Sequence, residues 1–240
     1  MSEETIRKLN ELGLHGMTQK LRELSASPQY SQYSHDDLLA VLVDHEFDRR
    51  KNNKIKRLLH DAKIKLPMAC VEEINYSAGR NLRKEEFKDL MSCSFIEHKQ
   101  NILISGATGV GKTYIACALA HLACRNGFST CYYRVARLLE YLKTERALGN
   151  YLKAVEKLGR IKLLVMDDLG PDILAKEDRN TFFEIIDERH LVAPTIIASQ
   201  LPLNQWHDLF DDAATADAIC DRVFQNSHKI QLKGDSMRKK

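Results

Sequence analysis

The sequence predicts an α/β protein in which a parallel sheet is flanked by helices and follows a small all-α domain. Three observations support this fold class. From Asn101 onward, short apolar runs alternate with stretches of helical apolar spacing, a pattern typical of a parallel sheet covered on both faces. The segment Gly106–Thr113, GATGVGKT, lies between an apolar run and a helical stretch, as a phosphate-binding loop does. Residues 1–75 show helical apolar spacing instead.

The segment GATGVGKT satisfies every position of the pattern G-x-x-x-x-G-K-[ST] and predicts a nucleoside triphosphate site in a P-loop NTPase fold. Glycines let the loop backbone bring several N–H groups to a phosphate chain at a helix N-terminus. Lys112 is expected to reach the β- and γ-phosphates of ATP, and the Thr113 hydroxyl to bind Mg²⁺. A chance match is expected in about one chain in a hundred, but here the flanking strand and helix argue against it. The expected nucleotide-binding positions are Gly106, Ala107, Thr108, Gly109, Val110, Gly111, Lys112 and Thr113.

A second motif is the apolar run Leu163–Met166, which leads into two carboxylates. Buried strands deliver such groups to the carboxyl edge of a sheet, where ligands bind in open α/β folds. Asp167 is expected to hold Mg²⁺ opposite Thr113, and Asp168 to orient or deprotonate the attacking water. The alternative is an exposed acidic turn, which is less favoured because adjacent carboxylates repel and need a counter-charge.

The N-terminal part predicts a helix or helix pair over Thr5–Leu24, broken near Gly13 or Gly16, and then a loop over 25–33. Ser34 and Asp37 form a capping box for a second helix that Pro67 is expected to end. Short helices around Gly79 follow. We therefore expect a helical DNA- or partner-binding domain over 1–75, a linker region over 76–98 and the nucleotide-binding domain over 99–240.

The later elements follow from apolar runs and glycines. Gly127 is expected to follow the first helix and Gly159 to end a helix over 151–158. Further helices are expected over 177–191 and 213–226. The expected strands cover 101–105, 130–134, 161–166, 195–198 and 228–232.

Eight cations lie within the seventeen residues 49–65, opposed there only by Asp61. A solvated helix face is the plain interpretation, but such faces normally intersperse acids. We therefore expect this cluster to contact DNA phosphates. The candidate DNA-binding residues are Arg49, Arg50, Lys51, Lys54, Lys56 and Arg57, and Lys63 and Lys65 complete the cluster.

The composition limits which partners, metal sites and compartments fit this sequence. A net charge of +3 and a pI near 8.4 do not by themselves indicate nucleic acid binding. The six cysteines form no C-x-x-C pair, which favours small buried thiols in a reducing compartment over a zinc site. The sequence shows no leader peptide and no membrane-length apolar run, so we expect a cytoplasmic protein with no membrane partner.

Five motifs together resemble the IstB-type helper ATPases of insertion-sequence transposition, close relatives of the DnaC and DnaI helicase loaders within the AAA+ group. They are GATGVGKT, LLVMDDLG, TIIASQLP, DAICDRVFQNSHKIQLKGDSMR and the N-terminal LNELGLHGMTQKL. The resemblance covers essentially the whole chain. It implies that Arg222 is an arginine finger for a neighbouring subunit's nucleotide and Arg238 a sensor arginine. Gln200, beside Ser199, matches the polar tip that senses the γ-phosphate. Tyr114 stands where many relatives have His.

By this resemblance the chain is an AAA+ ATPase that uses ATP and Mg²⁺, assembles on double-stranded DNA and presents that DNA to a cognate transposase. Since 18 residues follow Arg222 in the 240-residue chain, no substantial C-terminal lid is expected and nucleotide would be held largely between subunits. ATP should therefore drive homo-oligomer formation. A helicase-loading ATPase in DNA replication is the alternative. A small-molecule kinase is disfavoured, and the ABC signature and the guanine-reading N-K-x-D of GTPases do not occur.

Overall fold

The computed structural model describes residues 3–76, 79–170, 172–210 and 212–237. The chain divides into two compact units, Met1–Arg57 and Leu58–Lys240, called here the helical unit and the sheet unit. Residues 58–98 thus group with the sheet. The limits expected from the sequence, 1–75, 76–98 and 99–240, stay a prediction about which parts of the chain act as separate domains.

The helical unit contains two short helices and most of a long one, and its small core includes Leu21, Leu24 and Leu42. Its elements are α1 (Glu3–Glu11), α2 (His15–Ser25), the 3₁₀ helix η1 (Pro28–Gln32) and α3 (His35–Ala62), whose last turns belong to the sheet unit. The break between α1 and α2 falls at Gly13, whose φ of 71° suits glycine. The expected capping box is confirmed: the Asp37 N–H donates to Ser34 Oγ at 3.1 Å, and Ser34 Oγ donates to Asp37 Oδ2 at 2.6 Å.

A buried carboxylate joins α2 to α3. Glu46 is 5% exposed and accepts the N–H groups of Gly16 at 2.6 Å and Met17 at 3.3 Å, at the N-terminus of α2. Burial raises the pKa of Glu46, but hydrogen bonds from Arg50, Gly16 and Met17 outweigh burial and leave that pKa below its ordinary value. The helices approach so closely that a Cβ on Gly16 would meet Glu46 Oε2 at 2.7 Å. Glycine at this position therefore allows the contact.

The end of α3 differs from the expectation. The helix ends at Ala62 because Lys63 adopts a left-handed φ of 49°, so Pro67 lies beyond the helix and does not terminate it. Three short helical segments follow before the sheet: the 3₁₀ helix η2 (Val71–Glu73), α4 (Lys84–Met91) and α5 (Ser94–Glu97).

Five parallel strands form the sheet in the order β2-β3-β4-β1-β5. Their bounds are β1 Asn101–Gly106, β2 Thr130–Arg134, β3 Leu163–Leu169, β4 Thr195–Ser199 and β5 Ser227–Leu232. Successive side chains enter opposite cores: Ile102 and Ile104 face one, and Leu103 faces the other. The P-loop NTPase fold class is thereby confirmed.

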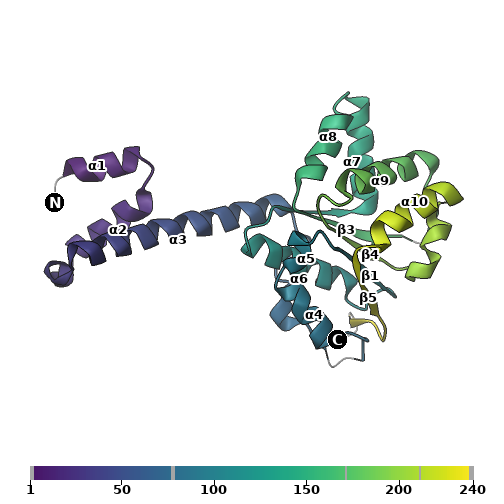
Figure 1. Cartoon of the computed structure of the whole chain (residues 1–240), viewed down its shortest axis with the longest axis horizontal. Helices are drawn as coiled ribbons and strands as arrows, with labels where there is room; N and C mark the ends of the chain where they lie inside the picture. Colours follow the sequence, from purple (N-terminus) through teal and green to yellow (C-terminus); the bar gives the residue numbers. More distant parts are fainter. Residues whose placement is uncertain (1–2, 77–78, 171, 211, 238–240) are drawn as a thin grey trace. The chain divides into compact units, whose positions relative to one another are not determined.

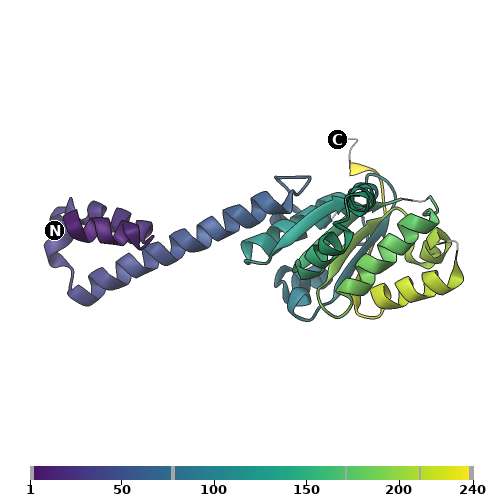
Figure 2. The same cartoon turned by 90° about the horizontal axis from the view of Figure 1, so that it is seen from above.

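Helices cover both faces of this sheet (Figures 1 and 2). The core that holds Ile102 also takes in α6 (Lys112–Arg125), and α4 and α5 contribute to the same core. The opposite core is shared with α7 (Val135–Ala147), α8 (Tyr151–Arg160), α9 (Lys176–Arg189) and α10 (Ala213–Phe224). As expected, Gly127 follows α6 with a left-handed φ of 84°.

Two local expectations need correction, and one 3₁₀ helix was not expected from the sequence. Strand β3 continues through both aspartates to Leu169. Gly159 lies inside α8, where a Cβ would meet Glu188 Cγ at 2.8 Å, so this glycine permits close helix packing and does not end the helix. The 3₁₀ helix η3 (Leu203–Phe210) directly follows Pro202 and places Trp206, 0% exposed, in the core.

Among the described residues, no helix is long and apolar enough to cross a membrane. The same residues contain no group of three or more His, Cys, Asp or Glu side chains that could hold a metal ion. All six cysteines are free thiols, and Cys93, Cys117, Cys124 and Cys220 are buried.

Candidate nucleotide site

The phosphate loop connects β1 to α6 at the carboxyl edge of the sheet. Gly109 and Gly111 have φ values of 87° and 102°, the left-handed conformation that glycine adopts without strain. Lys112 opens α6, and its Nζ donates to the carbonyl oxygens of Gly106 at 2.6 Å and Ala107 at 2.8 Å. The lysine side chain therefore lies back across the loop, and it is only 8% exposed.

Asp167 forms a hydrogen-bonded cluster with two hydroxyls. Thr113 Oγ1 donates to its Oδ2 at 2.9 Å, and the Tyr132 hydroxyl donates to the same oxygen at 2.5 Å. Asp167 is 1% exposed, so these contacts compensate for the burial of its carboxylate. Burial, followed by the contact with Asp167, strongly raises the pKa of Tyr132 and keeps its hydroxyl protonated as a donor.

The hydroxyl and carboxylate oxygens of Thr113 and Asp167 fit Mg²⁺, a hard cation that takes oxygen ligands and usually shares them with phosphates. Their separation of about one hydrogen bond, 2.9 to 3.2 Å, lets both groups face one ion. The pair therefore suits a magnesium site beside the phosphate loop.

Asp168 has a different environment from its neighbour. Its carboxylate accepts hydrogen bonds from Arg134 and, at 3.4 Å, from Gln200 Nε2. The hydrogen bond from Arg134 is the main cause that lowers the pKa of Asp168. Its φ of 63° is unusual for a non-glycine residue, and the pairing of β3 with β4 shifts register beside it. Such strained backbone often occurs at functional sites.

Gln200 links the second carboxylate to the phosphate loop. It follows β4, donates to Asp168 and accepts a hydrogen bond of 2.9 Å from Thr108 Oγ1. Thr108, Gln200 and Asp168 thus form one polar row along the carboxyl edge. The sequence-based placement of Gln200 near the γ-phosphate is compatible with this geometry.

A cavity of about 290 Å³ collects these groups. Its lining also contains Lys65 and Leu66, which follow α3, and Met237 from the tail. The Met237 N–H donates to the Gly109 carbonyl at 2.9 Å, so the tail packs on the phosphate loop. Arg238, the expected sensor arginine, lies outside the described residues. The expected residues that line the cavity are Thr108, Gly109, Gly111, Lys112, Thr113, Asp167, Asp168 and Gln200.

Sequence reasoning missed four side chains of this site. Tyr132 and Arg134 hold the two aspartates, and Lys65 was assigned only to the basic cluster. Arg80, 5% exposed, donates through Nη1 to the Val110 carbonyl at 3.3 Å. It comes from a stretch that the sequence predicted as a linker and offered no signal for this contact. By contrast, Lys65 could have been noticed as the last cation before the expected breaker Pro67.

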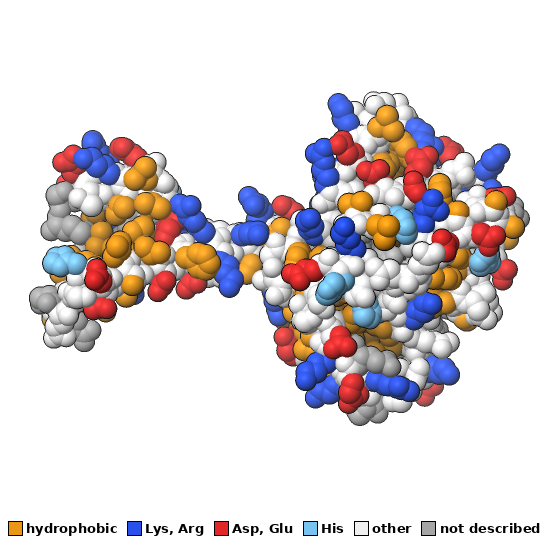
Figure 3. All heavy atoms as spheres, viewed as in Figure 1, with side chains coloured by type: hydrophobic (Ala, Val, Ile, Leu, Met, Phe, Trp, Pro, Cys, Tyr) orange, Lys and Arg blue, Asp and Glu red, His pale blue; other side chains and the backbone are white. Residues whose placement is uncertain are grey.

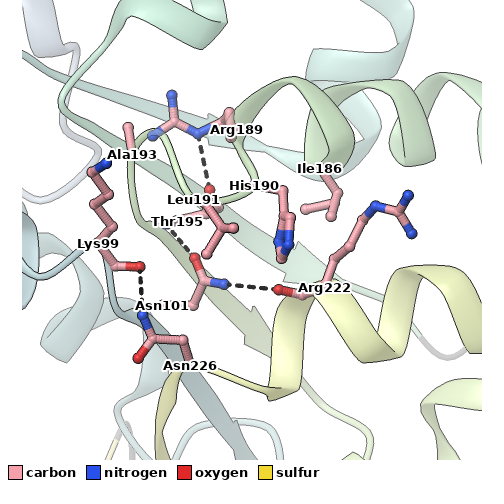
Figure 4. A pocket seen from close by; sticks show the side chains of 10 residues that line it. All are labelled: Lys99, Asn101, Ile186, Arg189, His190, Leu191, Ala193, Thr195, Arg222 and Asn226. Carbon is pink, nitrogen blue, oxygen red and sulfur yellow. Dashed lines mark hydrogen bonds between the residues drawn. The ribbon is translucent and has the colours of Figure 1, made fainter.

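Arg222 lies at the opposite edge of the sheet from the phosphate loop. Asn101, the first residue of β1, donates through Nδ2 to the carbonyl of Arg222 at 3.5 Å (Figure 4). The same Nδ2 also donates to the carbonyl of Val223 at 3.3 Å. The loop begins at the other end of this strand, roughly 17 Å away at about 3.3 Å per residue. The structure therefore does not bring Arg222 to the nucleotide cavity of its own chain.

The six candidate DNA-binding cations all lie on α3 in the helical unit. Arg49 and Arg50 approach Glu46, at 4.0 and 2.6 Å, so part of their charge is already balanced. The remaining four, Lys51, Lys54, Lys56 and Arg57, are exposed. On the sheet unit, the face seen in Figure 3 mixes basic and acidic side chains.

Sequence comparisons relate this chain to known ATP-binding proteins. The sequence profile of the family described as IstB-like ATP binding protein matches residues 7–240. An insertion-sequence ATP-binding protein of Sinorhizobium fredii is 37% identical over 239 residues, which cover 100% of this chain and 97% of the relative. Another, from Pseudomonas fluorescens, is 37% identical over 202 residues, covering 84% and 87%.

Among solved structures, the DnaC helicase loader matches with a TM-score of 0.56 at 18% identity, covering 69% of this chain and 97% of that chain. AMPPCP-bound DnaA from Aquifex aeolicus matches with a TM-score of 0.60 at 19% identity, covering 72% and 52%. These low identities support a shared fold alone. Because the family profile spans nearly the whole sequence, the chain belongs to the IstB-like ATP binding protein family.

Proposed function

We propose that this chain is a cytoplasmic, Mg²⁺-dependent ATPase that assembles on double-stranded DNA and assists a cognate transposase in selecting target DNA. Relatives named as insertion-sequence ATP-binding proteins match it along its whole length, which supports the link to transposition. The observation that carries the mechanism is the separation of Arg222 from the phosphate loop of its own chain. If Arg222 takes part in hydrolysis, it must act on the nucleotide of a second subunit.

ATP binding is assigned to the loop and the residues around it. Backbone N–H groups of Gly106–Gly111 surround the phosphates, and Lys112 contacts the β- and γ-phosphates. Thr113 and Asp167 would hold Mg²⁺, which neutralises charge on those phosphates when it is bound. Tyr132 fixes the orientation of the Asp167 carboxylate through the bond described above.

The second aspartate is assigned to the attacking water. Asp168 is ionised at neutral pH, as an aspartate with a pKa lowered by Arg134 must be, and its carboxylate can accept a hydrogen bond from water. Gln200 connects this carboxylate to Thr108 of the loop. In this position its side chain would sense the γ-phosphate. Arg238, which directly follows the cavity-lining Met237, is assigned to the same phosphate.

Arg222 is assigned to the nucleotide of a neighbouring subunit, where a guanidinium stabilises the charge that develops during hydrolysis. ATP would then favour assembly, since the nucleotide links two subunits, and hydrolysis would release them. The reaction acts as a switch for a DNA-bound homo-oligomer.

The helical unit supplies the proposed DNA and transposase contacts. Arg50, Lys54 and Arg57 follow one another at helical spacing on α3 and can neutralise successive phosphates. Three apolar side chains precede them on the same helix at a spacing of four residues, and they are 57%, 50% and 65% exposed: Leu39, Val43 and Phe47. An apolar stripe of this kind suits a protein partner.

Sedimentation of the protein with short duplex DNA under ATP, ADP or no nucleotide tests the proposal. Large complexes should form with ATP, and Asp168→Asn should make them accumulate because binding is retained while water activation is lost. Equal complex sizes with ATP and ADP would contradict the switch. If Asp168→Asn abolishes ATP binding, then the assigned roles of the two aspartates must be exchanged.

A helicase loader is the second candidate, and it has less support because the matches to DnaC and DnaI are below 20% identity and carry the fold alone. It predicts preference for single-stranded DNA and a complex with a replicative helicase. Binding of duplex and single strands of equal length, with and without added helicase, separates the two functions.

A further inference from the structure

The guanidinium of Arg222 is held by three groups of its own chain. Its Nε donates to Asp187 Oδ1 at 2.8 Å, and its Nη1 donates to the Ala218 carbonyl at 3.0 Å. The ring of Phe183 lies against it, with the guanidinium carbon 5.0 Å from the ring centroid. Phe183 and Asp187 are four residues apart on α9, so they lie on one face of that helix.

These contacts leave a particular edge of the group available. Asp187 occupies Nε and the Ala218 carbonyl takes one of the two N–H groups of Nη1, while Nη2 has no hydrogen-bond partner among the described residues. The side chain of Arg222 is 29% exposed and extends from α10 away from Asn101 (Figure 4). The Nη1–Nη2 edge is the one that matches two phosphate oxygens in a bidentate contact.

We infer that Asp187, supported by Phe183, is a positioning residue that presents the Nη1–Nη2 edge of Arg222 to the nucleotide of the adjoining subunit. This inference rests on the proposed trans role of Arg222 and adds the residue that orients it. An arginine has four rotatable side-chain bonds, so an unanchored guanidinium would sample many orientations. Anchoring the guanidinium before assembly avoids the loss of side-chain conformational entropy when it binds the neighbour's phosphate.

The opposite role, in which Asp187 holds Arg222 away from phosphate, predicts the opposite result. Removal of a restraining carboxylate would raise the ATPase rate, whereas removal of a positioning carboxylate lowers it. Asp187→Ala should therefore reduce the ATPase rate of the DNA-bound assembly by about 10- to 100-fold, the range for a misplaced catalytic group. Arg222→Ala should have a larger effect, on the order of 10³-fold.

Several measurements distinguish positioning from a general structural role. The ion pair is half-exposed, with Asp187 at 53%, so its loss should leave the unfolding temperature and the ATP affinity of the subunit nearly unchanged. Asp187→Glu retains a carboxylate and should recover part of the rate. The double variant Asp187→Ala/Arg222→Ala should be no slower than Arg222→Ala, because both changes remove one function.

Assemblies that mix two variants show whether the defect of Asp187→Ala lies on the side that donates the arginine. Asp187→Ala mixed with Lys112→Ala should recover activity, since Lys112→Ala subunits donate an intact Arg222 to an intact loop. Asp187→Ala mixed with Arg222→Ala should not recover, because both lack a properly presented arginine. Asp217→Ala is the control: this acid lies on α10, the helix that carries Arg222, but it approaches His207 at 3.6 Å.

The results that contradict the trans role of Arg222 differ from those that contradict the positioning role of Asp187. If Arg222→Ala retains the full ATPase rate, the proposed trans function is wrong and the inference falls with it. If Arg222→Ala is slow while Asp187→Ala matches the wild type or exceeds it, only the positioning role is overturned. Recovery with Arg222→Ala would likewise overturn it, because the defect would then lie outside the arginine-donating side.

Discussion

Replacing Tyr132 by Phe removes one hydroxyl from the centre of the candidate site and leaves the ring in place. Tyr132 is 7% exposed and Asp167 is 1% exposed, so water has little access to the carboxylate that loses its donor. A hydrogen bond to a charged group contributes about 1.5–3 kcal/mol to stability. The sheet unit should be destabilised by that amount.

Thermal unfolding without nucleotide measures this loss. For a domain of this size, each kcal/mol shifts the melting temperature by about 2–4 °C, so Tyr132→Phe should lower it by roughly 3–12 °C. Tyr133→Phe is the matched control: this neighbouring residue stacks on Tyr141 with ring centroids 6.2 Å apart, and its side chain belongs to the opposite core. Its melting temperature should change much less.

Function should respond in the same direction. A less constrained Asp167 would hold Mg²⁺ less well, so Tyr132→Phe should bind ATP more weakly in Mg²⁺ while its affinity in EDTA changes little. Equal melting temperatures for Tyr132→Phe and the wild type would refute the hydrogen-bonded cluster. A loss of ATP affinity that is the same in EDTA would refute the assignment of Asp167 to the metal.

Three further predictions concern separate parts of the molecule. Lys112→Ala should abolish ATP binding, measured by calorimetry, because it removes the ammonium that lies across the phosphate loop. Arg134→Ala should move the acid limb of the ATPase pH profile upward: the pKa of Asp168 is lowered mainly by Arg134, so its carboxylate is ionised above that lowered value and protonates as pH falls through it. Lys54→Ala/Arg57→Ala should reduce the log–log salt slope of duplex DNA binding by about 1.8, or 0.9 per lost contact.

A different result would contradict each of these three predictions. Folded Lys112→Ala with normal ATP affinity would place the nucleotide elsewhere, and an unmoved acid limb in Arg134→Ala would assign the titration to another group. For DNA, Lys84→Ala/Lys88→Ala on α4 is the control, with both residues exposed. An equal effect of both double variants would mean that the cations of α3 act only as general surface charge.

The central strands β1, β3 and β4 were predictable from the sequence because a parallel sheet covered on both faces requires continuous apolar runs there. The phosphate loop and Asp167–Asp168 were predictable because their chemistry is local in sequence. The end of α3 was not, since Lys63 adopts a left-handed conformation for which lysine gives no signal. Gly159 was misinterpreted for a related reason: a glycine that permits helix packing looks like one that ends a helix.

The supporting residues of the site depend on register and long-range packing. Tyr132 and Arg134 reach the aspartates because β2 pairs with β3 so that Arg134 lies opposite Asp167, and no periodicity specifies that alignment. Arg80 reaches Val110 across thirty residues of sequence. The distance between Arg222 and the loop likewise required the three-dimensional structure, because it depends on the contact of α10 with Asn101 at the start of β1, which no local pattern specifies.

The central claim is that one subunit supplies the phosphate loop and another supplies Arg222. Mixing Lys112→Ala with Arg222→Ala on duplex DNA tests it most directly, since each variant alone should be inactive. Interfaces between an intact loop and an intact arginine form only in mixed assemblies, so we predict partial recovery of the ATPase rate that depends on the mixing ratio. No recovery, in samples where labelled subunits are shown to co-assemble, would contradict the account.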